Sequence, residues 1–212
     1  NTYVLAHGWV NTGGNPENNY EASEQGMLLA TKGLLESGDI TPEDNIIWVD
    51  WSAFSGYNLS NEGLANQIVR GGNYSISASS VGQRSEIIKD YLVNELGFDT
   101  PEEFAKLNLV GFSLGAQTMG TLGQLFKLDE DLKARNGEES LVPNEVWLLD
   151  PAGTMFEQAF SDMNQEVADN YTPVFYDSGE NVYAIHSSKN TGYDFPIGTY
   201  DIYVNAFDIN IP

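Results

Sequence analysis

Residues 107–115, which read LNLVGFSLG, decide how this chain folds. The first six form an apolar run of strand length, and a helical pattern follows from Leu114 to Leu128. Gly111 and Gly115 flank Ser113 in the pattern G-x-S-x-G. A serine at such a strand-to-helix turn adopts a strained backbone, and side chains two positions away on either side would collide there. The stretch therefore predicts a nucleophilic serine above a sheet; the alternative is a glycine-rich turn with a surface serine.

Apolar runs of similar length recur along the chain, with helical patterns between them. Strands are predicted at 2–7, 45–51, 107–112, 145–150, 182–186 and 200–204, and helices around 27–35, 81–96 and 114–128. Met27, Leu28, Leu34 and Leu35 share one face of the first helix, and Gly38 suits its C-terminal stop. Continuous apolar runs bounded by loops are typical of strands buried on both faces of a parallel sheet. The alternation predicts one α/β domain over residues 1–212, with a doubly wound, mostly parallel sheet and flanking helices. The charged stretch 129–139 is predicted to be a solvated loop.

The composition excludes several classes of function. The chain has 212 residues, of which 41% are hydrophobic, so it is not a disordered chain. With 9 Lys and Arg against 31 Asp and Glu, the net charge of −22 argues against binding to nucleic acid or to anionic membranes. A neutral or zwitterionic lipid surface stays compatible with this charge. No apolar run is long enough to span a bilayer, and the absence of cysteine removes disulfides and thiolate chemistry.

A serine nucleophile requires a base, an orienting acid and donors for an oxyanion. Asp150 follows the apolar run 146–149, so it is predicted at a strand end beside Ser113, in the chain order that α/β-hydrolases use. The alternative is an ordinary carboxylate at a strand end. Gly8 follows the first strand and would let the backbone swing inwards, so that the N–H groups of Trp9 and Leu114 together form an oxyanion hole.

These residues resemble the animal neutral lipase family, which includes pancreatic and lipoprotein lipases, insect phospholipases A1 and insect yolk proteins. The resemblance is carried in the family's order by 4–9, 47–52, 111–116 with Gly120 and Gly123, 149–153, and 185–187 with 196–198, 201–203 and Asn205. It implies an α/β-hydrolase fold, with Ser113 as nucleophile, Asp150 as triad acid, and Trp9 and Leu114 in the oxyanion hole. It implies a lipid ester substrate, of triacylglycerol or phospholipid type, and no cofactor. No ligand spacing in the acidic loops supports calcium.

The chain departs from the family at several positions. Family members usually have His where Phe112 and Gln117 stand, and His or Asp where Thr199 stands. The family's catalytic histidine follows the strand that contains Asp201, after a lid. We therefore expect residues 1–212 to lack the family's N-terminal strands and its C-terminal lid and histidine segment. The chain opens at Asn1 directly in strand-like sequence, which we interpret as a processed or partial chain.

The chain contains two histidines, and both are predicted to be structural. His7 precedes Ser113, which is the wrong order for the base. His186 follows Asp150 but is surrounded by apolar Val182, Ala184 and Ile185, which is typical of a strand. Without a base, Ser113 is an ordinary alcohol, and the loss of a triad member lowers turnover by about 10⁴- to 10⁶-fold.

Two functions of different class therefore stay open. The first is a secreted carboxylic ester hydrolase that acts on lipids; the second is an inactive storage, yolk or lipid-binding protein of the same fold. A phosphate-binding α/β domain is disfavoured because no Lys follows the glycines at 111–115. Three N-x-S/T sequons, at Asn58, Asn73 and Asn170, favour a secreted glycoprotein. The sequence does not indicate the oligomeric state.

Overall fold

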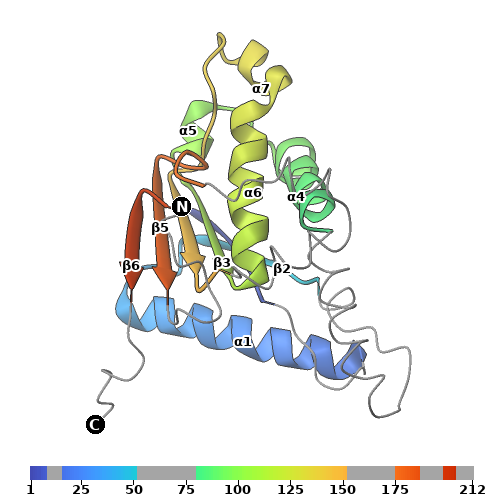
Figure 1. The fold of residues 1–212 in the computed structure, drawn as a ribbon, viewed down its shortest axis with the longest axis vertical. Coiled ribbons are helices and arrows are strands. Elements are labelled where there is room, and N and C mark those ends of the chain that lie inside the picture. The colour runs from blue at the N-terminus through green and yellow to red at the C-terminus, as the bar shows by residue number, and fades with distance from the viewer. Residues whose placement is uncertain (9–15, 52–79, 152–174, 187–197, 204–212) are drawn as a thin grey trace.

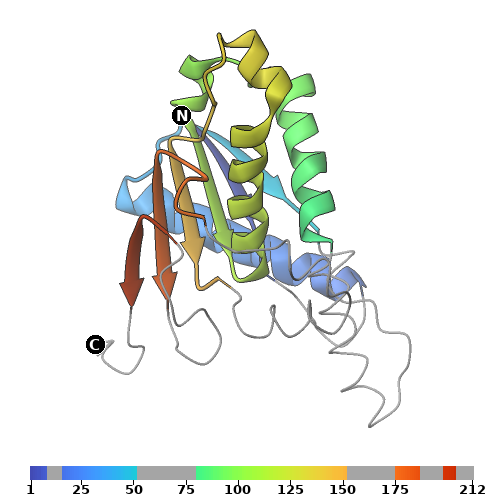
Figure 2. The same ribbon diagram turned by 45° about the horizontal axis from the view of Figure 1, so that its top comes forward.

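A parallel sheet lies at the centre of the molecule (Figures 1 and 2). The structure, a computed structural model, describes residues 1–8, 16–51, 80–151, 175–186 and 198–203. In these ranges six strands pair in the order β2-β1-β3-β4-β5-β6, and every neighbouring pair is parallel. The strands are β1 (Thr2–Ala6), β2 (Asn45–Val49), β3 (Leu107–Phe112), β4 (Glu145–Leu149), β5 (Asn181–His186) and β6 (Tyr200–Tyr203). The predicted doubly wound α/β fold is confirmed.

The order of the strands creates a switch point between β1 and β3. The chain passes from β1 outwards to β2 and then returns to β3 on the other side of β1. The register pairs Ala6 with Gly111 and Phe112 with Leu149, so the carboxyl ends of β1, β3 and β4 lie at one edge of the sheet. Ligands of open α/β sheets bind outside the carboxyl ends of strands at such a point.

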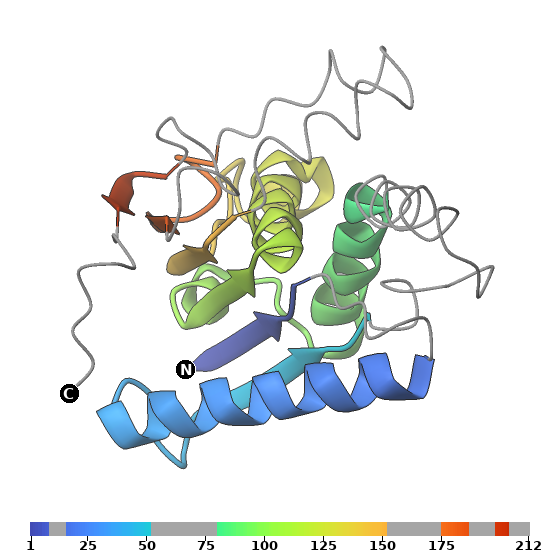
Figure 3. The same ribbon diagram turned by 60° about the horizontal axis from the view of Figure 1, so that its bottom comes forward.

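Helices lie on both faces of the sheet, as Figure 3 shows. Helix α1 runs along one face beside β1 and β2, whereas α4 and α6 cover the other face. The described helices are α1 (Pro16–Ser37), α4 (Val81–Asp90), the π-helical turn η1 (Tyr91–Glu95), α5 (Pro101–Phe104), α6 (Leu114–Leu128) and α7 (Glu130–Arg135). None of them combines the length and the apolar character that a membrane span requires.

Helix α6 is the centre of the core. Its glycines bring it close to its neighbours: an added Cβ at Gly123 would lie 2.0 Å from the Ser178 carbonyl oxygen, and one at Gly120 would lie 2.5 Å from the Phe175 ring. Phe126 packs edge-on against Phe104, with ring centroids 4.8 Å apart. The apolar cluster between α6 and the sheet includes Val4, Leu109, Met119, Leu122, Val146, Leu148, Val182 and Ala184.

Burial in the sheet differs from the expected two-sided pattern. Along β4 and β5 every second residue is buried and the residues between are half-buried. The buried set faces α6, because Val146, Leu148, Val182 and Ala184 belong to the cluster around that helix. The other set includes Trp147 and Tyr183, whose rings stack on each other, and the Tyr183 ring also stacks on that of Tyr200 in β6. In the described ranges, therefore, these strands bury one face more completely than the other.

Two helical predictions need correction. The stretch 129–139 is not wholly a loop, because it contains α7. The Asp129 carboxylate caps α7 by accepting the Leu132 N–H, and the Leu132 side chain is fully buried. In α1 the predicted stop at Gly38 is present, with φ of 80°. However, Leu28 and Leu35 of the predicted buried stripe are exposed, and of the four predicted stripe residues only Met27 is buried.

Gly123 provides a test of the close approach of α6. We expect Gly123→Ala to lower the free energy of unfolding by at least about 2 kcal/mol, because the new methyl group would meet backbone that cannot move aside. The matched control is Gly82→Ala in α4, where an added Cβ has open space, and a change within about 1 kcal/mol, in the stabilising direction, is expected. Urea unfolding of both variants measures the difference. Equal stability of the two would contradict the packing described.

Candidate active site

Ser113 occupies a strained turn between β3 and α6. Its φ of 53° and ψ of −117° are unusual for a residue with a Cβ, and it directly precedes the first residue of α6. Its side chain is partly exposed at the carboxyl edge of the sheet. The first N–H groups of a helix have no partner within the helix, so this turn presents donors and the positive end of the helix dipole.

The two flanking glycines make the turn possible. A Cβ at Gly111 would lie 2.3 Å from the Gly115 carbonyl oxygen. A Cβ at Gly115 would lie 2.4 Å from the His7 carbonyl oxygen and 2.5 Å from that of Ala6. Any side chain at either position would push α6 away from β3 or from β1. A side chain at Gly111 or Gly115 would therefore collide with backbone atoms, as the sequence pattern predicts that it would collide.

Asp150 lies at the end of the neighbouring strand. The Ser113 N–H donates to the Leu149 carbonyl at 2.8 Å, and the Asp150 N–H donates to the Ile185 carbonyl at 2.7 Å. Ser113 and Asp150 are thus each the first residue after paired strands, at the same edge of the sheet. Asp150 also has a positive φ, of 44°, so the chain turns sharply there. The structure brings these two predicted site residues together.

The carboxyl end of β1 also lies beside the turn at Ser113. A Cβ added at Gly8 would lie 3.0 Å from the Cβ of Ser113 and 2.9 Å from the ring of Phe112. Leu114 is fully buried at the start of α6. Trp9, the other predicted oxyanion donor, lies outside the described residues, as do the sequon residues Asn58, Asn73 and Asn170.

His7 is buried and both of its ring nitrogens have partners. Nδ1 lies 2.6 Å from the Gly8 carbonyl oxygen, and Nε2 accepts the Trp51 backbone N–H at 3.1 Å. The ring stacks on the Trp51 indole, with centroids 4.7 Å apart. Burial lowers the pKa of His7, and the Gly8 carbonyl and the Asp50 carboxylate oppose this shift only in part. His7 is therefore a neutral, structural group.

Arg84 completes this cluster, and nothing in the sequence pattern pointed to it. Its guanidinium lies 4.2 Å from the centre of the Trp51 ring, on a side chain that is only 7% exposed. It donates to the Ser80 and Thr118 hydroxyl groups. Thr118 lies in α6, where its hydroxyl also donates to the Leu114 carbonyl. Arg84 thus ties α4, Trp51 and the first turns of α6 together.

His186 is held in the sheet. Its Nε2 lies 2.8 Å from Oδ1 of Asp201 in β6, and its side chain is almost fully buried. The other carboxylate oxygen of Asp201 accepts the Gly198 N–H. Because His186 shares the alternating pattern of Val182 and Ala184, its ring lies on the face that α6 covers. This contact with Asp201 is that of a structural pair between two strands.

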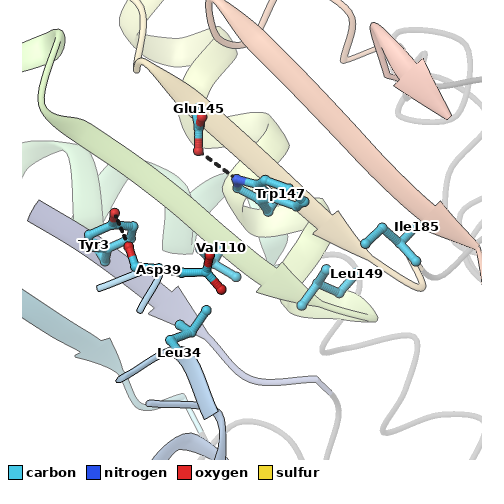
Figure 4. Close-up of a pocket in the computed structure, with 8 residues that line it drawn as sticks. All are labelled: Tyr3, Leu34, Asp39, Val110, Glu145, Trp147, Leu149 and Ile185. Carbon is cyan, nitrogen blue, oxygen red and sulfur yellow. Dashed lines mark hydrogen bonds between the residues drawn. The ribbon is translucent and has the colours of Figure 1, made fainter. Parts of the chain in front are cut away.

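A cavity of about 520 Å³ lies on the other face of the sheet (Figure 4). Tyr3 donates to the Asp39 carbonyl and Trp147 Nε1 donates to Glu145 at one end of it. Ser113 and Asp150 do not line this cavity, so we do not assign it to the chemistry. Within the described ranges, no group of three His, Asp or Glu side chains is arranged to hold a metal ion. The cavity lining consists of Tyr3, Leu34, Asp39, Val110, Glu145, Trp147, Leu149 and Ile185.

Known proteins resemble this chain along nearly its whole length. It is 29% identical over 205 residues to phospholipase A1 2 of Vespa affinis, which covers 95% of this chain and 49% of that protein. It is 28% identical over 214 residues to lipoprotein lipase of Sus scrofa, covering 97% of this chain and 34% of that one. The predicted resemblance to the animal neutral lipases is confirmed. No family model matches the chain.

The chain spans about half the length of its phospholipase A1 relatives and about a third of lipoprotein lipase. Among solved structures it is similar to that of RedJ with a PEG molecule bound in the active site. That match has 12% identity and a TM-score of 0.41, and covers 96% of this chain and 78% of the other. The fold assignment for this chain rests on its own strand order and pairing.

The structural role of His186 is testable in the full-length protein. We expect His186→Gln to lower the free energy of unfolding by about 1–2 kcal/mol, because the contact with Asp201 is weakened. Labelling of Ser113 by a fluorophosphonate should keep the wild-type rate, since His186 is engaged elsewhere. Asp201→Asn, which weakens the same pair, is the matched control. A loss of about 10⁴-fold in labelling with an intact fold would instead identify His186 as the base.

Proposed function

We propose that this chain is the central part of a carboxylic ester hydrolase that acts on lipids, of lipase or phospholipase A1 type. The observation that carries the proposal is Ser113, held at positive φ on the turn from β3 to α6, beside the strand end that bears Asp150. The relatedness to phospholipase A1 and lipoprotein lipase supports the lipid ester as substrate class.

The proposed chemistry is acyl transfer through a serine. The Ser113 Oγ attacks the ester carbonyl carbon while a histidine base takes its proton, and Asp150 orients that histidine. The tetrahedral oxyanion accepts hydrogen bonds from the N–H groups of Leu114 and Trp9. The histidine then protonates the departing alcohol, and water releases the fatty acid by the same steps in a second round. No cofactor takes part in this sequence.

The base has to come from outside these 212 residues. His7 Nε2 already accepts the Trp51 N–H, so its lone pair is not available for the Ser113 proton. His186 is held against Asp201 within the sheet. We therefore propose that a histidine from another part of the whole protein completes the triad, and that residues 1–212 form a single α/β-hydrolase domain together with that part.

The second candidate is a lipid-binding or storage protein with the same fold and no activity. The engagement of both histidines and the net charge of −22 favour it. A fluorophosphonate discriminates between the two candidates, because it reacts rapidly only with an activated serine. Reaction of the native full-length protein at Ser113 supports the enzyme, and absence of reaction supports the inactive protein.

Location and partners follow from the same proposal. An acidic hydrolase of this class would meet its substrate at a neutral or zwitterionic lipid surface, because anionic headgroups and nucleic acids repel its charge. We propose that the protein is secreted, on the basis of its three sequons and of its relatives.

Substitution of the two proposed catalytic residues tests the mechanism. In the full-length protein we expect Ser113→Ala to lower kcat for a phospholipid or triacylglycerol ester by about 10⁴- to 10⁶-fold. Asp150→Asn should lower kcat by about 10⁴-fold, because an amide stabilises the wrong tautomer of the histidine. The matched control is Ser37→Ala at the exposed end of α1, which should keep wild-type turnover. Wild-type kcat in Ser113→Ala would refute Ser113 as nucleophile.

Secretion predicts a glycan on at least one of Asn58, Asn73 and Asn170 in material from the natural source. Treatment with a peptide:N-glycosidase should lower the intact mass and convert the modified Asn to Asp. Unmodified mass at all three sites would count against passage through a secretory pathway.

A further inference from the structure

We propose that Phe112 is a specificity-determining residue: its half-exposed ring, beside Ser113, contacts an uncharged alkyl chain of the ester and selects long-chain substrates over short or polar ones. This inference rests on the proposed function, because it concerns the substrate of the same site. Either the acyl part or the alcohol part of the ester can supply such a chain. Every residue that forms the contact surface lies within the described ranges.

The Phe112 ring lies at the turn that carries the proposed nucleophile. Phe112 is the last residue of β3 and directly precedes Ser113. A Cβ built on Gly8 would lie 2.9 Å from Phe112 Cδ1 and 3.0 Å from the Ser113 Cβ, so both side chains border the same point of the backbone. An ester carbonyl that the Ser113 Oγ attacks would therefore carry its neighbouring groups close to this ring.

Much of the ring is open to a ligand. Phe112 meets Gly8 with its Cδ1–Cε1 edge, and the residue is 52% exposed. A phenyl ring has no hydrogen-bond donor or acceptor, and covering it with an alkyl chain removes apolar surface of both from water. An anionic or hydrogen-bonding group in the same place would lose water and gain no hydrogen bond from the ring. The contact therefore favours hydrocarbon.

Phe112 belongs to a continuous apolar row across the carboxyl ends of four strands. The register pairs Phe112 with Leu149, Leu149 with Ile185, and Ile185 with Ile202. Leu149 and Ile185 are half-buried and line the cavity on the face opposite α6 (Figure 4), and Ile202 is 46% exposed. A single exposed apolar side chain is ordinary, whereas a contiguous row that ends beside a nucleophile indicates a surface for an apolar ligand.

A purely structural role for Phe112 makes a different prediction. If the ring only covers the Gly8 backbone, its loss disturbs the turn and lowers turnover of every ester by the same factor. If the ring contacts the substrate chain, its loss lowers turnover of long-chain esters and leaves short ones nearly unchanged. The dependence on chain length therefore separates the two roles.

The first test is kinetic and uses the full-length protein with methyl octanoate, octyl acetate and methyl acetate. We expect Phe112→Ser to lower kcat/KM by at least about 10-fold for one or both octyl esters and to keep that for methyl acetate within about 3-fold. A loss with methyl octanoate assigns the acyl chain to the ring, and a loss with octyl acetate assigns the alcohol chain. Phe112→Leu, which keeps an apolar side chain, should restore most of the loss.

The matched control is Leu128→Ser, which removes an apolar side chain that is 65% exposed at the far end of α6. It should keep the wild-type ratio of kcat/KM between long and short esters. Equal losses for all three esters in Phe112→Ser, or no loss for either octyl ester, would overturn the proposed specificity. If Phe112→Ser does not fold, Phe112→His replaces it, because imidazole keeps an aromatic ring and adds polar nitrogens.

The second test measures binding without chemistry. 4-Fluorophenylalanine replaces Phe112 in the full-length Ser113→Ala variant, and ¹⁹F resonances are followed during titration with methyl octanoate. We expect a saturable shift that methyl acetate does not produce. The same label at Phe98, which packs against the core at the opposite end of β3, should not shift.

Failure of the proposed function and failure of this inference are distinguishable. If the wild-type protein shows no turnover that depends on Ser113, the hydrolase is refuted, and the ¹⁹F titration alone decides whether Phe112 binds an alkyl chain. Turnover that depends on Ser113, without a shift at Phe112 and without an effect of chain length in Phe112→Ser, would overturn the role of Phe112 and leave the hydrolase intact.

Discussion

The contact among β1, β3 and α6 that only glycine permits is the constraint on which the site depends. An added Cβ at Gly111 would meet the backbone of α6, and one at Gly115 would meet the backbone of β1. Both distances are near 2.4 Å or below and involve backbone atoms, so no change of side-chain rotamer could remove the collisions. The close approach forces the chain into the turn at Ser113, with its positive φ. The strain at Ser113 is thus imposed by packing that reaches from β1 to the end of β3.

The sequence predicted the framework because the framework depends on local patterns. Each strand is a short run of apolar residues, and the G-x-S-x-G pattern needs only a strand before it and a helix after it. Asp150 could be placed beside Ser113 because the carboxyl ends of parallel strands meet at one edge of a sheet. These predictions needed the order of elements along the chain and no knowledge of side-chain contacts.

What the sequence could not predict depends on contacts across the fold. Helix α7 has a single buried residue, Leu132, and no periodic apolar pattern along its length. Its sequence therefore could not predict that a helix forms there. Helix α1 shows a leucine pattern, but Leu28 and Leu29 are exposed, and only its packing beside β1 and β2 decides which of its residues are buried. Arg84 lies in α4, 33 residues along the chain from Trp51, and only the packing of α4 on α6 brings its guanidinium over that ring.

The two histidines illustrate how one residue type takes two structural roles. His186 carries its ring between two strands, where a carboxylate at 2.8 Å accepts from Nε2. His7 carries its ring between two backbone groups of opposite kind, and these groups determine which nitrogen holds the proton. A backbone donor to one ring nitrogen excludes the charged form of an imidazole, in which both nitrogens carry a proton. His7 is therefore held as a neutral ring at the carboxyl end of β1, between the Gly8 carbonyl and the Trp51 N–H.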